Sequence, residues 1–520
     1  KNFNLENHIK ELFKKIEYIR EIKIAKAGFL NIFFIENLFI SNLNDILIQK
    51  SNYGNNSLGN NKKINIEFVS ANPTGPIHIA HIRGAVLGDV LSSILEANGY
   101  LITREYYVND AGSQVQVLAN SLYKRYQQLF NIDVKISDND YPGTYLISIA
   151  KNIVEKDSDI WLQKDENQRI DFFKKFAITE LINSIKNDLK LIGINFDIFK
   201  YESDIVKENL IEEVFKLLNK KELLYEGYLD KPNNGDIEDW EPRKQLLFKS
   251  SQFSDDKDRP FKKADGEWTY FANDAAYHYD KFLRKFSSLI NIWGADHIGY
   301  ISRMKSITEV ISDKKDYLDI QICQIVRLIK NGKILKMSKR EGNFITLKDI
   351  LNQVGKDPLR YFMISNRSET PMDFDMDKVI EKNKDNPVFY CQYAFARASS
   401  VINKSKSYDQ LKSFNDNFNE FDFSLLSKYE VNIILKLIAW PYLLYQIGEL
   451  KQPHKLIIYL EDLCSDFHSF WNKGKDDQSL RFIDTNNIKK TITKLLWIES
   501  FRIVLKRIFD LIGIDAHENM

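Results

Sequence analysis

The sequence predicts an α/β protein in which a parallel sheet precedes an all-α helix bundle. Two observations support this prediction. Between residues 64 and 108 a short apolar strand, a turn-rich loop, an amphipathic helix and a second strand follow one another, which is the order of a βαβ unit. From about residue 386 to the end, apolar residues recur at three- and four-residue spacing, which is typical of packed helices. We therefore expect a Rossmann-like sheet followed by the bundle.

Composition narrows the class of protein further. The 520 residues suffice for about three domains. Lys and Arg number 73 against 72 Asp and Glu, so the net charge is +1 and any nucleic-acid site must be local. Cys323, Cys391 and Cys464 are too far apart for a disulfide framework or a cysteine-rich zinc site. This usage fits a reducing cytosol and predicts a cytoplasmic protein with no metal site of its own.

No membrane span is expected. The longest apolar stretch lies around residues 28–40 and is interrupted by Asn31, Glu36 and Asn37, whereas a span needs about 20 apolar residues. No signal peptide is visible. Because the first residue is Lys1 rather than Met, we expect the natural beginning of the chain to be missing. No exposed heptad pattern or long apolar stripe stands out, which predicts a monomer.

The individual elements follow from local patterns. The βαβ unit is expected to have a strand at 64–69, a loop at 70–76, a helix at 79–98 that Gly99 ends, and a strand at 101–108. Residues 115–260 are polar and mostly helical, which is typical of an insertion. Further strands are expected at 268–271, 289–293 and 323–329, and Asn331-Gly332 predicts a hairpin turn.

The first candidate site is the loop that opens the predicted helix. Residues 72–84 read Asn-Pro-Thr-Gly-Pro-Ile-His-Ile-Ala-His-Ile-Arg-Gly, at the carboxyl edge of the sheet, where such folds bind ligands. A helix N-terminus favours phosphate, His78 and His81 share one face of its first turn, and Gly75 lets a ligand approach the backbone. The alternative is an ordinary helix start with two incidental histidines.

The second candidate site follows the predicted hairpin. Residues 336–340 read Lys-Met-Ser-Lys-Arg. Lys336 and Lys339 could neutralise a polyphosphate, Ser338 could hydrogen-bond to it, and charge on a departing pyrophosphate would thereby be stabilised. The alternative is a solvated basic surface loop.

Together the two segments resemble the signature motifs of class I aminoacyl-tRNA synthetases. Longer segments that begin at Glu67, Arg104, Trp293 and Asn386 resemble bacterial arginyl-tRNA synthetases, and the likeness runs from about residue 25 to the end. Two features depart from the family. Ala80 stands where the family usually has glycine, and the N-terminal part before the first motif is shorter than in family members.

The resemblance implies a function and three domains. The function is ATP-dependent activation of L-arginine to arginyl-adenylate and its transfer to the 2′-hydroxyl of the terminal adenosine of tRNA(Arg), with Mg²⁺ bound alongside ATP and no protein nucleophile. The domains are a remnant of an N-terminal tRNA-contacting α+β domain at 1–58, a catalytic domain at 59–375 with the insertion, and a helical anticodon-binding domain at 376–520.

The resemblance also assigns residues to ATP. His78, His81, Lys336 and Lys339 are expected to be catalytic, through contacts to phosphate oxygens and to the departing pyrophosphate. The full ATP-binding set is Gly75, Pro76, His78, Ala80, His81, Gly294, Asp296, His297, Met337 and Ser338. Asp296 is assigned to the ribose hydroxyls, and its alternative is a loop carboxylate or helix cap.

Arginine selection requires carboxylates, because a guanidinium is a planar, permanently charged fork of donors. The family places Tyr270 and Asp274, four residues apart, on this group; the alternative is a core tyrosine and a helix cap. By the same resemblance the rest of the arginine site is Glu67, Ser70 and Asn72, and Asn109, Asp110 and Gln114 could also line it. The 255 positions between the two motifs are too few for a large editing insertion.

Contacts to tRNA are expected on a local face of the C-terminal region, because residues 381–520 hold 19 Lys and Arg against 18 Asp and Glu. The candidates are Tyr390, Tyr393, Arg397, Arg502, Lys506 and Arg507. A plain helix with a core and a surface face would explain the same residues. Three rival functions stay open: a smaller nucleotidyltransferase, a non-catalytic paralogue that only binds tRNA, and a class I synthetase for another amino acid.

Overall fold

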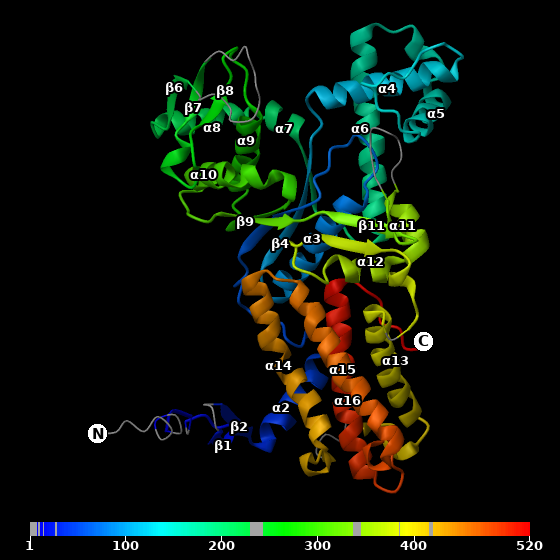
Figure 1. Cartoon of the computed structure of the whole chain (residues 1–520). Helices are drawn as coiled ribbons and strands as arrows, with labels where there is room; N and C mark the ends of the chain where they lie inside the picture. Colours follow the sequence, from blue (N-terminus) through cyan, green and yellow to red (C-terminus); the bar gives the residue numbers. More distant parts are fainter. Residues whose placement is uncertain are drawn as a thin grey trace. The chain divides into compact units, whose positions relative to one another are not determined.

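The computed structural model describes residues 8, 11–13, 15–25, 29–228, 243–335, 345–383, 385–414 and 420–520. The chain divides into two compact units (Figure 1). One combines residues 1–56 with 381–520, and the other spans residues 57–380. The three domains expected from the sequence have different boundaries and stay a prediction.

The central unit is built on a five-stranded sheet in the order β10-β9-β3-β4-β5, and every neighbouring pair is parallel. Its strands are β3 (Lys63–Glu67), β4 (Leu101–Val108), β5 (Ile198–Tyr201), β9 (Ser288–Gly294) and β10 (Leu318–Cys323). Helix α3 (Ile79–Ala97) connects β3 to β4, so the predicted βαβ unit and the α/β class are confirmed. Inward-facing residues of β3, such as Ile64 and Ile66, are buried.

Two groups of elements are inserted between the strands. Between β4 and β5, α4 (Ser113–Leu129), α5 (Tyr145–Asp157) and α6 (Glu166–Leu191) surround an apolar core of their own. Between β5 and β9 lie α7 (Glu202–Lys207), α8 (Leu210–Lys220), an antiparallel sheet of β6 (Leu224–Tyr228), β7 (Lys244–Phe248) and β8 (Arg259–Lys262), and α9 (Tyr270–Leu283). Figure 1 shows these two groups as separate bodies beyond the parallel sheet.

Two strand predictions were wrong in this region. Residues 268–271 were expected to be a strand, but Thr269 caps α9 by accepting a hydrogen bond from the Ala272 amide, and the helix begins at Tyr270. Residues 323–329 were expected to be one strand, but β10 ends at Cys323 and β11 (Val326–Lys330) begins a different sheet. A local apolar pattern cannot distinguish these outcomes, because caps and chain reversals depend on tertiary partners.

The second small sheet carries the predicted hairpin. Strand β11 pairs antiparallel with β12 (Lys333–Ile334) and parallel with β13 (Met372–Asp375). Asn331 and Gly332 both have positive φ, 50° and 68°, which matches the twist that a two-residue hairpin needs and confirms the turn. Buried Arg83 of α3 donates to the carbonyls of Gln324, Arg367 and Thr370, which precede β11 and β13. Helices α10 (Ile301–Ser312), α11 (Leu347–Val354) and α12 (Lys356–Met363) complete the unit.

The other unit is the predicted helix bundle. Figure 1 shows α13 (Pro387–Ser405), α14 (Lys428–Leu450), α15 (His454–Asp476) and α16 (Ile488–Ile512) side by side. Helix α2 (Glu36–Gln49) packs against α14 and α16, and β1 (Ile19–Ile24) and β2 (Leu30–Phe34) form a hairpin before it. Asn386 caps α13 and Ser427 caps α14, which explains where each helix begins.

Helix α14 corrects one expectation from the sequence. Among the described residues, this is the helix that is long and apolar enough, by length and composition, to cross a membrane. The segment to compare with a membrane span is therefore α14 and not the stretch around residues 28–40. Its apolar residues include Ile433, Leu437 and Trp440, which are fully buried inside the bundle. Glu430 in its first turn accepts a hydrogen bond from the indole of Trp497 in α16. Together with the buried apolar residues, this contact makes α14 part of the core of the bundle.

Candidate active site

The site lies where β3 ends at the carboxyl edge of the parallel sheet. Glu67 is the last residue of β3, and Val69 and Ser70 after it have φ of 67° and 36°. A β-branched residue rarely adopts a positive φ, so this turn is strained, as is common beside ligand sites. The hydroxyl of Ser70 donates to Glu67 Oε1 (3.0 Å) and accepts from the Tyr107 amide (3.1 Å). The turn thereby presents the Glu67 carboxylate from the sheet edge.

Three carboxylates from different elements face one region. Glu67 comes from β3, Glu202 begins α7, and Asp274 lies in the first turns of α9. Tyr300 donates its hydroxyl hydrogen to Asp274 Oδ2 (2.8 Å), and Asn273 donates to Glu202 Oε1 (3.0 Å). These carboxylates interact electrostatically, because both Glu202 and Glu67 act on Asp274. Their arrangement suits a ligand that carries positive charge.

Burial raises the pKa of two carboxyl groups in this acidic region. It raises the pKa of Asp274 to about 7, and the neighbouring Glu202 and Glu67 raise it further, whereas the Tyr300 hydroxyl and the Arg303 guanidinium oppose the shift. Burial also raises the pKa of Glu202, and Asp110 acts in the same direction. A carboxyl group whose pKa lies near neutral pH is typical of a functional site. A cationic ligand bound there would relieve the repulsion between the carboxylates.

A buried salt-bridge cluster supports the site from behind. Glu105 of β4 receives two bonds from the Arg284 guanidinium (2.6 and 2.8 Å), one from the Tyr277 hydroxyl (2.8 Å) and one from the Asn65 amide (2.7 Å). Glu105 is fully buried, which raises its pKa, but the Arg284 guanidinium, the Lys281 charge and the Tyr277 hydroxyl together hold this pKa below the ordinary value. The cluster joins β3, β4 and α9, which are the elements that carry Glu67 and Asp274.

Four further residues expected at the arginine site form hydrogen bonds with one another or with the start of α7. Asn72 donates to Gln114 Oε1 (3.1 Å), and Asp110 accepts from the Ser203 amide (2.8 Å) at the start of α7. With its nitrogen turned toward Glu202, the amide of Asn109 donates to Glu202 Oε2 (2.9 Å). Asn109 and Asp110 thus lie at Glu202 and its neighbour, whereas Asn72 and Gln114 contact each other.

Tyr270 behaves differently from the other expected arginine-site residues. Its side chain is 72% exposed at the first position of α9, and the phenol that contacts Asp274 belongs to Tyr300. Tyr300 closes the segment that begins at Trp293, so the family motif held a signal for it. Glu202 lies outside every motif that we recognised, and no local pattern would have found it.

The two histidines lie together at the start of α3. His78 precedes the helix, and its backbone amide donates to His81 Nδ1 (3.3 Å). The imidazole centroids are 4.0 Å apart. The backbone of His78 also forms an isolated β-bridge with Thr346, the capping residue of α11. Residue 346 follows closely on the second motif, whose predicted residues Lys336, Met337, Ser338 and Lys339 lie outside the described residues.

The other residues assigned to ATP flank these histidines or end β9. Gly75 and Pro76 precede His78, and a Cβ on Gly75 would meet the Tyr145 ring at 3.5–3.7 Å. Ala80 is exposed in the first turn of α3. Gly294 is the last residue of β9, and the side chains of Asp296 and His297 after it are 80% and 60% exposed. The pair is therefore open to a ligand at the carboxyl edge of the sheet.

The helical unit holds the residues assigned to tRNA in two separate places. Arg397 donates to His468 Nδ1 (2.8 Å) and lies over the rings of Tyr393 (4.2 Å) and Trp471 (5.2 Å), while the Tyr390 carbonyl accepts from His468 Nε2 (3.0 Å). In the second place, on α16, Arg502 contacts Glu499 and Glu518, Lys506 contacts Asp510, and Arg507 contacts Asn55. Carboxylates thus offset two of these three charges.

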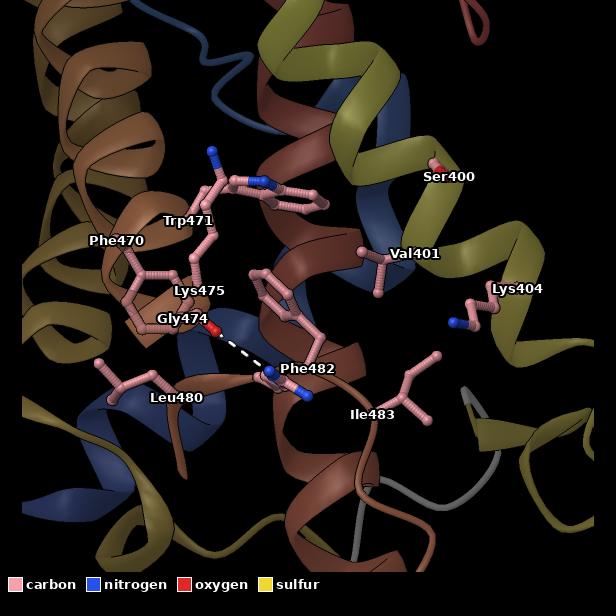
Figure 2. Close-up of a pocket in the computed structure, with 11 residues that line it drawn as sticks. Ser400, Val401, Lys404, Phe470, Trp471, Gly474, Lys475, Leu480, Phe482 and Ile483 are labelled. Carbon is pink, nitrogen blue, oxygen red and sulfur yellow. Dashed lines mark hydrogen bonds between the residues drawn. The ribbon is translucent and has the colours of Figure 1, made fainter. Parts of the chain in front are cut away.

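A cavity of about 450 Å³ adjoins the first of these places. Figure 2 shows the rings of Phe470, Trp471 and Phe482 gathered at one side of it and Lys404 at the other. Lys475 and Arg481 also line it, and both are exposed, whereas Phe482 is buried at its base. The cavity thus combines an aromatic base with a cationic rim.

Comparisons with known proteins agree with this geometry. Residues 42–391 match the family of class I (R) tRNA synthetase catalytic domains, and residues 391–520 match the DALR anticodon-binding domain. The fold and the site therefore define a class I aminoacyl-tRNA synthetase.

Individual relatives narrow the class. The arginine–tRNA ligase of Orientia tsutsugamushi (strain Ikeda) is 42% identical over all of this chain and 88% of the relative, and that of Ruegeria pomeroyi is 41% identical over 96% and 86%. The structure of Thermus thermophilus arginyl-tRNA synthetase shares the fold, with a TM-score of 0.73 and 18% identity over 99% of this chain and 91% of that one. The chain belongs to the arginine–tRNA ligase family.

Proposed function

We propose that this protein activates L-arginine with ATP and transfers the arginyl group to the 2′-hydroxyl of the terminal adenosine of tRNA(Arg), as a cytoplasmic monomer. The observation that supports the proposal most directly is the electrostatic effect of both Glu67 and Glu202 on Asp274, three carboxylates that come from β3, α7 and α9. In a class I synthetase, an acidic pocket at this edge of the sheet fits a dicationic amino acid. The same pocket disfavours an acidic or apolar one.

Arginine would bind with its guanidinium on Asp274 and Glu202 and its α-ammonium group toward Glu67 and Asn72. The planar fork of the guanidinium can donate to both carboxylates at once. Lysine has fewer donors and would leave one of them unpaired, at a cost of about 1–3 kcal/mol for each lost charge-assisted bond. Several such losses give discrimination on the order of 10⁴-fold without an editing domain.

The chemistry would rest on positioning and charge. The arginine carboxylate attacks the α-phosphorus of ATP in line, and pyrophosphate leaves. His78 and His81 would donate to phosphate oxygens at the helix N-terminus, and Lys336 and Lys339 would stabilise the departing pyrophosphate. Glycine and proline at positions 75 and 76 would lie along the triphosphate, with Ala80 near adenine and the residues after β9 near the ribose.

Mg²⁺ would neutralise charge on the phosphates. Within the part of the chain that the structure describes, no three His, Cys, Asp or Glu side chains gather as metal ligands. We expect the ion to be held mostly by the phosphates of ATP, with few protein ligands.

The helical unit would bind the anticodon loop of the tRNA. An unpaired base can stack on Trp471 in the aromatic cavity, while phosphates contact Lys404, Lys475 and Arg481 at its rim. The exposed cations make this face locally positive although the unit is nearly neutral overall. Among the residues expected from the sequence, those nearest this cavity are Tyr393 and Arg397, through their contacts with each other and with Trp471.

One experiment tests the proposal against its rivals. ATP–pyrophosphate exchange is measured with each of the twenty amino acids, in the presence and absence of tRNA. We expect exchange with arginine alone, and we expect it to depend on added tRNA. Exchange with another amino acid would refute the specificity, and no exchange with any amino acid in the presence of tRNA would refute the activity.

A further inference from the structure

Lys281 of α9 is a completely buried lysine that contacts Glu67, one of the three carboxylates of the candidate site. Its side chain is 0% exposed, and its ammonium nitrogen lies 2.6 Å from Glu67 Oε2. The same nitrogen donates to Asn291 Oδ1 (3.3 Å) and lies 4.4 Å from the centroid of the Tyr277 ring. Because the group is sealed from solvent, no substrate can replace it or reach it. Lys281 can therefore affect a substrate only through its contact with Glu67.

The contacts continue from Lys281 to the backbone of Asp274. Asn291 Nδ2 donates to His278 Nε2 (3.0 Å), and His278 Nδ1 lies 2.8 Å from the Asp274 carbonyl oxygen. The carbonyl can only accept, so Nδ1 carries the imidazole hydrogen and Nε2 accepts from the amide. Burial and the nearby Lys281 charge lower the pKa of His278 to about 3, so the ring is neutral. The chain of donors is thus fixed in one direction.

This chain connects the Glu67 carboxylate to the backbone of α9 at Asp274. It runs from Glu67 on β3 through Lys281, Asn291 and His278 to the α9 backbone at Asp274. All three connecting side chains are buried, and their contacts join α9 to β3 through Glu67 and to β9 through Asn291. Buried polar networks whose members are all satisfied hold their groups rigidly. The network therefore fixes the Glu67 carboxylate relative to the backbone of α9 at Asp274.

The charge of Lys281 also distinguishes the two ends of the pocket. It compensates Glu67 directly, whereas Asp274 and Glu202 have no lysine or arginine salt bridge among the described residues. Arginine has two cationic groups, and an uncompensated Glu67 would attract the guanidinium as strongly as the other end does. With Lys281 in place, the excess negative charge lies at Asp274 and Glu202. The guanidinium is therefore directed there.

We propose that Lys281 is a positioning residue for arginine: it holds the Glu67 carboxylate in place for the α-ammonium group and directs the guanidinium to Asp274 and Glu202. The proposal rests on the function proposed above. It differs from a purely structural role, in which Lys281 only stabilises the fold and its loss would weaken every ligand to a similar extent or none.

The test is a double-mutant cycle on the full chain. Arginine binding is measured by isothermal titration calorimetry, and the KM values for arginine and ATP by aminoacylation, for the wild type, K281M, E67Q and E67Q/K281M. We expect K281M to raise the dissociation constant and KM for arginine by about tenfold or more, since a charge-assisted contact is disturbed, with the KM for ATP within about twofold. In the E67Q background, K281M should change arginine binding by less than about threefold.

The matched control is K494M. Lys494 is also a buried lysine paired with a buried glutamate, Glu430 at 3.5 Å, but it lies in the helical unit. K494M should lower the melting temperature and leave the arginine dissociation constant unchanged. K281R, which keeps the charge, should restore more arginine affinity than K281M retains.

Two results would overturn the role of Lys281. One is an unchanged arginine dissociation constant in K281M, and the other is an equal loss of affinity in the wild-type and E67Q backgrounds. If K281M alone does not fold, the comparison of E67Q with E67Q/K281M still decides: a loss of arginine affinity of more than about threefold in this background would overturn the role, because Lys281 would then act without Glu67. A wild-type protein that binds no arginine would instead overturn the proposed function, which separates the two failures.

Discussion

The pKa of Asp274 leads to a quantitative prediction about arginine binding. Burial and the neighbouring carboxylates Glu202 and Glu67 raise this pKa to about 7, against an ordinary value of 3.8. The guanidinium requires the ionised carboxylate, so protons and arginine compete for one group. Raising the pH from 6 to 8 increases the ionised fraction of Asp274 from about one in eleven to about ten in eleven. The dissociation constant for arginine should therefore fall about tenfold over this range.

The stability of the ligand-free protein should decrease as the pH rises, whereas its affinity for arginine increases. A carboxyl group whose pKa is raised by folding stabilises the folded state when it is protonated, and this contribution is lost as the pH rises from about 4 through 7. Bound arginine removes the repulsion that causes the loss. The increase in melting temperature that arginine produces should hence be larger at pH 8 than at pH 6.

The assay is isothermal titration calorimetry at pH 6, 7 and 8 at constant ionic strength. Two controls isolate Asp274. D274N should bind arginine about a hundredfold more weakly, since a bidentate charged contact is lost, and with little dependence on pH. Citrulline, whose ureido group is neutral, should gain no affinity between pH 6 and pH 8. His278 does not titrate in this range, because its pKa is about 3.

A flat pH dependence in the wild type would refute this reasoning. It would mean that Asp274 is ionised at all three pH values. Burial and the neighbouring acids would then not raise its pKa into this range. A pH dependence that persists in D274N would assign the titration to another group, such as Glu202, whose pKa burial also raises.

Three further predictions concern other parts of the molecule. E202Q should weaken arginine binding about tenfold by calorimetry, since one charge-assisted contact becomes neutral, and an unchanged affinity would remove Glu202 from the site. G88A should lower the free energy of unfolding by about 1–3 kcal/mol in urea, because its Cβ would overlap the buried Phe68 ring. G84A is the control on the same helix: its Cβ would lie 3.8 Å from the nearest side chain, so stability should not fall. W471A should weaken tRNA binding about tenfold in a filter-binding assay while arginine affinity stays constant; an equal loss of both would contradict a role confined to tRNA.

The sequence by itself determined the local elements and the class of protein. The βαβ unit, the Asn331-Gly332 hairpin and the C-terminal helices follow from apolar periodicity and turn chemistry, which act over a few residues. The motif around His78 also predicted the family, because its residues lie in one continuous segment. Where the pattern was short, as at residues 268–271, the helix cap at Thr269 overrode it.

Only the tertiary structure decided which side chains form the acidic pocket. Glu67, Glu202 and Asp274 come from three elements that are separated by 135 and 72 positions, so no local spacing relates them. Tyr270 was expected together with Asp274 on the guanidinium; its side chain is 72% exposed at the first position of α9, and the phenol that donates to Asp274 is that of Tyr300, from another element. Burial decided the rest. A lysine or a histidine is written the same way on a surface and in a core, and only packing seals Lys281 against Glu67 and lowers the pKa of His278.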